Sequence, residues 1–177
     1  MESYRVDIGS ILGVLGECLS VDDEVAIDKF AVGDEEFTPL GPVRFTLTIA
    51  NTGTAVIASG TAELPVQATC ARCLTEFPTE ILGEVDGFYI MPGDEEGVPE
   101  EQEIEYVDPE GLVELWPAIH AALVLEAPFA PLHDEECAGI CPQCGADLNG
   151  GPCECPQGVG DTHPFAGLKD LLGSDQQ

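Results

Sequence analysis

Alternating hydrophobic and polar residues predict that the first half of the chain is mainly β-structure. In residues 43–49 every second side chain is apolar and those between are polar, the pattern of a strand with one buried face. Asn51-Thr52-Gly53 favours a turn, and residues 54–64 return as a second strand, which predicts a hairpin. Further strands are expected at residues 66–70 and 79–90. The buried face of the last strand is expected to carry Ile81, Val85 and Tyr89.

One main helix is predicted at residues 116–125, because Pro117 fits a first helical turn and Pro128 closes the segment. A shorter helix is expected at residues 161–173, with an apolar stripe that docks on the sheet. The expected core consists of Phe45, Leu47, Ile49, Val56, Val66, Val85, Phe88, Trp116, Ile119 and Leu123.

These elements predict an α+β fold with a β-rich, mostly antiparallel sheet, built from about residues 25–90, and one main helix. We expect residues 1–135 to form the β-rich α+β domain. Residues 136–177 are expected to form a zinc-binding loop and a short C-terminal helix packed on that domain. Residues 92–108 are rich in Asp, Glu, Gly and Pro, so self-repulsion and poor burial favour a mobile loop there. The favoured interpretation of this loop is a solvated linker. The alternative interpretation is an acidic surface that binds a basic partner.

The charge of the chain limits its partners. It has 34 Asp and Glu against five Lys and Arg, a formal net charge of −29. A surface this negative repels phosphate, so tight binding to naked RNA is disfavoured and a basic protein is the expected partner. Acidity that only confers solubility is the alternative. The longest apolar stretch, residues 116–132, is interrupted by prolines and charge, so no membrane span is expected.

Seven of the eight cysteines lie in three short clusters with the spacing of metal ligands. The clusters are Cys70-Ala-Arg-Cys73, Cys137 with Cys141-Pro-Gln-Cys144, and Cys153-Glu-Cys155, and Cys18 stands apart. Two thiolates separated by two residues can hold one zinc ion because the turn between them points both sulfurs inward. A glycine directly after the second cysteine, as at Gly145, tolerates the positive φ that such a turn often needs.

A disulfide framework is the competing explanation, and it requires an oxidising compartment. The N-terminus shows no basic start and no long apolar run of a secretory signal. A cytoplasmic protein with reduced, zinc-binding cysteines is therefore favoured.

The ligands can be divided in two ways. In the first division, one complete four-sulfur set consists of Cys141, Cys144, Cys153 and Cys155. The other set then contains Cys70, Cys73 and Cys137 and needs a fourth ligand. His133 is the nearest candidate, although a lone histidine is more often an ordinary surface residue. Two Zn²⁺ ions are then expected. The alternative pairs Cys70 and Cys73 with Cys141 and Cys144 around one ion, as in a zinc ribbon. Arg72 is expected to supply counter-charge to the thiolates of its own turn.

The order of these motifs resembles the YceD family of large ribosomal RNA subunit accumulation proteins. The resemblance rests on three runs and on the helix that lies between the first two of them. The runs are Cys70-Ala-Arg-Cys73-Leu74 after a hairpin, Cys137-Ala-Gly-Ile-Cys141-Pro-Gln-Cys144-Gly145-Ala-Asp147-Leu148-Asn149, and Pro164-Phe165-Ala166-Gly167-Leu168-Lys169-Asp170-Leu171.

The resemblance implies a non-enzymatic factor in ribosome biogenesis that is required for accumulation of large-subunit ribosomal RNA. It also implies an association with the gene for a small, basic, zinc-containing ribosomal protein. Some relatives lack the later cysteine cluster, so the family's general function does not depend on that site.

Two other classes of function share some of these sequence features. A redox-sensitive zinc-thiolate chaperone or switch protein is the alternative, because the chain combines Cys-x-x-Cys, Cys-x-Cys and abundant acid. Embedding of the first pair between strands argues against it. A zinc hydrolase is disfavoured, since a catalytic ion keeps an open position and His120, His133 and His163 are scattered.

Overall fold

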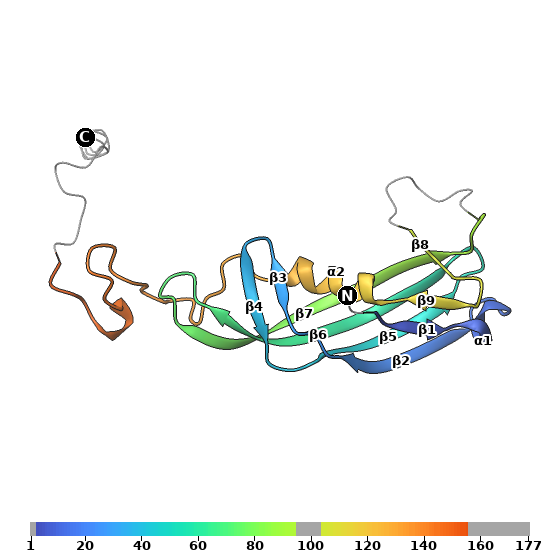
Figure 1. The fold of residues 1–177 in the computed structure, drawn as a ribbon, viewed down its shortest axis with the longest axis horizontal. Helices are drawn as coiled ribbons and strands as arrows, with labels where there is room; N and C mark the ends of the chain where they lie inside the picture. The colour runs from blue at the N-terminus through green and yellow to red at the C-terminus, as the bar shows by residue number, and fades with distance from the viewer. Residues whose placement is uncertain (1–2, 95–103, 156–177) are drawn as a thin grey trace, which may run out of the picture.

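The main sheet is built around four long antiparallel strands whose apolar side chains share one face. The computed structural model describes residues 3–94 and 104–155 of the chain. Across the sheet lie β2 (Cys18–Val25), β5 (Val43–Asn51), β6 (Val56–Thr69) and β7 (Glu76–Ile90). They run side by side along the long axis of the molecule (Figure 1). The predicted α+β class and the hairpin, which is β5–β6, are both confirmed.

Shorter strands extend this sheet or form a second one. β4 (Glu35–Pro39) pairs with the end of β6, and β3 (Phe30–Val32) pairs with β4. β8 (Glu105–Tyr106) pairs in parallel with the end of β7. β1 (Arg5–Asp7) and β9 (Leu112–Glu114) form a separate antiparallel pair. Two short helical elements complete the described part of the chain, α1 (Gly9–Leu12) and a 3-10 turn at Leu148–Gly150.

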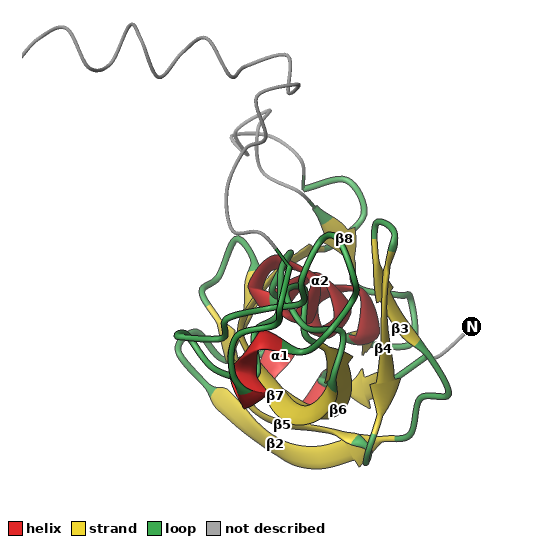
Figure 2. Ribbon diagram, turned by 90° about the vertical axis from the view of Figure 1, so that its left-hand side faces the viewer, coloured by secondary structure: helices red, strands yellow, loops and turns green. Residues whose placement is uncertain are grey.

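The main helix, α2 (Trp116–Glu126), packs on the inner face of the sheet, which curves around it (Figure 2). Its crossing point on β7 is Gly83, where a Cβ atom would lie 2.6 Å from the backbone of Ala122. A side chain at Gly83 would push the helix away, so this glycine sets the close approach of helix and strand. Nine of the ten predicted core residues are buried, namely Phe45, Leu47, Ile49, Val56, Val66, Val85, Trp116, Ile119 and Leu123.

The tenth, Phe88, was placed wrongly. It is only half-buried, whereas its neighbour Tyr89 is fully buried in the core. Side chains of a strand alternate between faces, so Phe88 cannot share a face with Ile81, Val85 and Tyr89.

The separate strand predicted at residues 66–70 is instead the second half of β6, which runs through Pro65 without a break. A proline in a strand is tolerated where its missing N–H is not needed. The carbonyl of Pro65 accepts from the N–H of Leu40, so its nitrogen faces the same edge. Pro65 lies between the ladder with β5, which ends at Glu63, and the ladder with β4, which begins at Val66.

Two predicted boundaries also change. The sheet begins at β2 rather than near residue 25; this strand is mostly exposed and its alternation is hidden by Asp22-Asp23-Glu24. The acidic loop predicted at residues 92–108 ends earlier, because Glu105–Tyr106 form β8 and Val107 is fully buried. Residues 95–103 and the helix predicted at 161–173 lie outside the described residues, and the division at residue 135 stays a prediction.

Candidate metal centres

The first cysteine pair lies in the turn that joins β6 to β7, as predicted. The N–H of Leu74 donates to the carbonyl of Cys70, and the N–H of Cys70 donates to the carbonyl of Thr75, both at 2.9 Å. These two bonds close a tight turn at the tip of the longest hairpin. The turn is therefore held by the hydrogen-bonded ladder between β6 and β7, and this ladder restricts the positions of both thiols.

The second Cys-x-x-Cys turn repeats this hydrogen-bond pattern. The N–H of Gly145 donates to the carbonyl of Cys141, and the N–H of Cys141 donates to the carbonyl of Ala146, both at 2.8 Å. The residue after the second cysteine has a positive φ in both turns, 61° at Leu74 and 72° at Gly145. The positive φ expected at Gly145 is confirmed. The same backbone is strained at Leu74, because its Cβ crowds the following carbonyl.

We expect Leu74→Gly to stabilise the protein by about 0.5–1 kcal/mol. Relief of the left-handed conformation gains about 1–2 kcal/mol, and the greater freedom of glycine in the unfolded chain offsets about half of that. Little packing is lost, since Leu74 is 62% exposed. Urea unfolding measures the change, and Gly145→Ala is the matched control that should destabilise. A loss of stability in Leu74→Gly would show that the leucine side chain, not the turn, is what matters.

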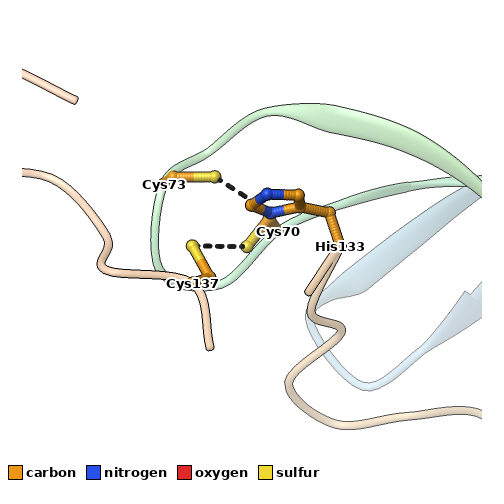
Figure 3. A group of neighbouring side chains, drawn as sticks. All are labelled: Cys70, Cys73, His133 and Cys137. Atoms are coloured by element: carbon orange, nitrogen blue, oxygen red, sulfur yellow. Dashed lines mark hydrogen bonds between the residues drawn. The ribbon is translucent and has the colours of Figure 1, made fainter. Parts of the chain in front are cut away.

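Four potential ligands converge at the turn between β6 and β7 (Figure 3). Cys70 and Cys73 come from the turn, and His133 and Cys137 come from the chain that follows α2. The sulfurs of Cys70 and Cys137 lie 3.8 Å apart, and the sulfur of Cys73 lies 3.4 Å from Nδ1 of His133. Two sulfurs each about 2.3 Å from a tetrahedral zinc are about 3.8 Å apart, whereas a disulfide measures about 2.05 Å. The separations therefore fit a tetrahedral metal site.

This first group is set in an apolar surrounding. Cys70, Cys73 and Cys137 are buried, and Phe77 and Leu132 pack against them. The ring of His133 is more exposed and meets the ring of Phe77 at 6.3 Å between centroids. Three of the four donors are therefore shielded from solvent, and the exposed fourth donor is the histidine.

The second group lies within one short segment of chain. Cys141, Cys144, Cys153 and Cys155 place their sulfurs within 4.8 Å of one another, the same limit that holds for the first group. Cys141 is buried, Cys144 is exposed and the other two are half-buried. In the part of the chain that the structure describes, none of the eight cysteines forms a disulfide. The second group is thus an open counterpart of the first, with four sulfurs and more solvent around them.

The protonation of the thiols differs within each group. Burial opposes ionisation of Cys70, but hydrogen bonds from the His133 side chain and from backbone N–H groups outweigh it and lower its pKa to about 5. Backbone N–H groups of Cys144 and Gln143 lower the pKa of Cys141 to about 6. Hydrogen bonding to Cys144 raises the pKa of Cys155 to about 12. A divalent cation would remove this competition and allow every thiol of a group to ionise.

The eight predicted ligands thus fall into the two groups of four that the first partition expected. The alternative, in which the two Cys-x-x-Cys turns face one another, is not the arrangement found. Cys18 is exposed and belongs to neither group, and His120 packs beside the rings of Phe30 and Trp116. Metal ligation by the eight residues stays a prediction.

Two contacts around the groups were not predicted. Arg72 was expected to act as a counter-charge, and its guanidinium donates to the main-chain carbonyls of Glu135 and Cys137 at 2.9 and 3.0 Å. It thereby fastens the segment that carries Cys137 to the first turn. Asn149 places its amide nitrogen 3.5 Å from the sulfur of Cys137. The only sequence signal for this contact is the run Asp147-Leu148-Asn149 after the second turn.

The donor sets indicate a structural role for a bound metal. Each group offers four sulfur or nitrogen ligands, which fill a tetrahedron and leave no open position for a water or a substrate. Thiolate-rich sets of this kind suit zinc rather than magnesium or calcium, which prefer oxygen. Separately, no helix among residues 3–94 and 104–155 has the length and hydropathy of a transmembrane segment.

Comparison with known proteins places these groups inside one matched region. The model of the family described as "Large ribosomal RNA subunit accumulation protein YceD" matches residues 58–172. An uncharacterized protein of Mycobacterium leprae is 27% identical over 107 residues, which are 60% of this chain and 49% of the relative. Uncharacterized proteins of Mycobacterium bovis and Mycobacterium tuberculosis are each 31% identical over 152 residues, 85% of this chain and 67% of the relative. The chain spans about half the length of the first relative. No solved structure matches it.

Proposed function

The chain belongs to the YceD family of large ribosomal RNA subunit accumulation proteins, and from this premise we propose that it is a non-enzymatic factor in ribosome biogenesis. In this role it supports accumulation of large-subunit ribosomal RNA in the cytoplasm. The observation that carries the proposal is the family match over residues 58–172, which includes β7, α2 and both ligand groups.

The two ligand groups hold structural Zn²⁺ in this proposal. Cys70, Cys73, His133 and Cys137 hold one ion, and they fasten the chain after α2 to the tip of the β6–β7 hairpin. Cys141, Cys144, Cys153 and Cys155 hold the other within their own loop. A loop of this length has no core of its own, so metal binding supplies its folding free energy.

The partner in this proposal is a basic ribosomal or ribosome-assembly protein. The outer face of the main sheet supports it: the aligned row Asp22, Thr46, Thr61 and Glu84 places carboxylates on the outer strands and hydroxyls between them. Arg44 lies on the same face, 3.6 Å from carboxylate oxygens of both Glu24 and Glu63. The net field is therefore negative and favours cationic side chains over phosphates.

Cells that lack the gene are expected to accumulate less large-subunit than small-subunit ribosomal RNA. Gel quantification of the two RNAs measures the ratio, and the wild-type chain should restore it. Cys70→Ser should restore it poorly, because that ligand ties the β6–β7 turn to the Cys137 segment. An unchanged RNA ratio in the deletion strain would contradict the proposed function.

The partner is expected to be captured from lysate in low salt, to survive RNase treatment and to dissociate in high salt. A triple variant on the outer face, Asp22→Asn, Glu63→Gln and Glu84→Gln, should weaken capture because it removes three negative charges there. The matched control changes the same charge on the β3–β4 hairpin with Asp34→Asn, Glu35→Gln and Glu36→Gln. Sub-micromolar binding of the purified chain to naked ribosomal RNA, with a steep salt dependence, would overturn this partner.

A further inference from the structure

One side chain, Asn149, joins the two ligand groups. It lies in the 3-10 turn Leu148–Gly150, between Cys144 and Cys153 of the second group. Its Nδ2 donates to the sulfur of Cys137 in the first group at 3.5 Å and to Oδ1 of Asp147 at 2.7 Å. Its Oδ1 accepts from the N–H of Ala138 at 2.8 Å. Both hydrogens of the amide nitrogen are thus used.

Chemistry decides which end of this amide faces the sulfur. The main-chain N–H of Ala138 can only donate, so it requires the oxygen of Asn149, and the nitrogen is left for Cys137. A hydrogen bond donated to a ligand sulfur fixes the orientation of that sulfur, and loss of such an outer partner typically weakens metal binding. Asn149 is therefore an outer partner of the first group, although it belongs to the loop of the second.

Main-chain contacts hold the same loop against the first turn. The N–H of Ile140 donates to the carbonyl of Arg72 at 3.2 Å, and the N–H of Leu148 donates to the carbonyl of Gly139 at 2.9 Å. Gly139 has a φ of 74°, and a Cβ atom there would lie 3.1 Å from the carbonyl oxygen of Arg72. The loop is thus seated closely, and its order decides whether Asn149 reaches Cys137.

We propose that Asn149 is a positioning residue that couples the two metal centres. Loading of the second group orders the loop, the loop presents the Asn149 amide to Cys137, and the first group then binds its metal more tightly. The inference rests on the proposed metal binding and adds to it that the two centres are not independent. Because coupling between two sites is reciprocal, loading of the first group also strengthens the second.

Titration of the full-length, reduced chain with Co²⁺ tests this coupling. Cobalt in a three-sulfur, one-nitrogen site and in a four-sulfur site gives different visible bands, so both groups are followed in one experiment. Asn149→Asp keeps an oxygen for Ala138 but loses the donor and sets a carboxylate beside the thiolate. We expect it to weaken Co²⁺ binding at the first group by about 10- to 100-fold, while the four-sulfur bands still reach full intensity.

Ser59→Asp is the matched control for the added negative charge. Ser59 is exposed on β6, eleven residues before Cys70 and so about 35 Å along the strand. This control should bind Co²⁺ like the wild type. The double replacement Cys153→Ser, Cys155→Ser should lower the Co²⁺ affinity of the first group as much as Asn149→Asp does. Combining all three changes should lower that affinity by less than about a further threefold.

Wild-type affinity at the first group in Asn149→Asp, or full additivity in the triple variant, would overturn the coupling. Absence of both sets of cobalt bands in the wild type would instead overturn the proposed metal binding, so the two failures are distinguishable. If Asn149→Asp does not fold by circular dichroism, His133→Ala decides. This variant removes an exposed ligand of the first group. Because coupling is reciprocal, it must weaken Co²⁺ binding at the four-sulfur site by the factor through which the loaded first group strengthens it. An unchanged Co²⁺ affinity of the four-sulfur site contradicts the proposal.

Discussion

Replacing Cys153 and Cys155 with serine is expected to remove one of two metal ions from the chain and to leave the other bound. The second group needs all four of its sulfurs to fill a tetrahedron, and serine hydroxyls do not replace thiolates. Structural zinc contributes folding free energy directly, about 10–16 kcal/mol in small zinc-dependent peptides. Loss of the ion should therefore release the loop at residues 138–155, which has few buried side chains.

The main sheet should survive this change, because its hydrophobic core contains no residue of the loop at residues 138–155. Hydrogen exchange should show fast exchange in the loop and unchanged protection in β5, β6 and β7. Cys70→Ser is the matched comparison: it breaks the first group, at the tip of the β6–β7 hairpin. If Cys153→Ser, Cys155→Ser abolishes all metal binding, the division into two groups is wrong.

Leu47→Ala is expected to destabilise the protein by about 2–5 kcal/mol. Leu47 is 1% exposed on the inner face of β5, between β2 and β6. Truncation leaves a cavity that a strand paired on both sides cannot close by shifting. Urea unfolding gives the change in free energy. Thr48→Ala, on the exposed face of the same strand, is the control and should change stability by less than about 0.5 kcal/mol. A change that small in Leu47→Ala would mean that the face was assigned wrongly.

The central part of the fold could be predicted because burial of one face of a strand requires apolar and polar residues to alternate along the sequence. Val43, Phe45, Leu47 and Ile49 alternate with exposed residues along β5, and the structure shows the same alternation in burial. Prolines at both ends marked α2 for a similar reason, since they limit where a helix starts and stops. The edge strand β2 was missed because Asp23 interrupts its apolar face, which carries Leu19, Val21 and Val25, so the sequence does not show an unbroken period of two.

The grouping of the candidate ligands could be predicted, but the hydrogen bonds that hold the ligand segments together could not. Zinc-ligand spacing is local, so counting donors was enough to divide Cys141, Cys144, Cys153 and Cys155 from the remaining three cysteines. The contacts of Arg72 with Glu135 and of Asn149 with Cys137 join residues whose meeting depends on how the loop folds back. Polar residues of this kind have no distinctive spacing, and only the three-dimensional structure shows where their hydrogen bonds go.

The zinc content of the full chain, purified without chelator, tests the division of the ligands into two zinc sites. Elemental analysis combined with native mass spectrometry gives the number of ions per chain, and thiol alkylation of the same sample shows which cysteines are protected. This division predicts close to two zinc ions, with the seven clustered cysteines protected and Cys18 reactive. One ion shared by the two Cys-x-x-Cys turns, with Cys153 and Cys155 freely alkylated, or no zinc at all, would contradict it.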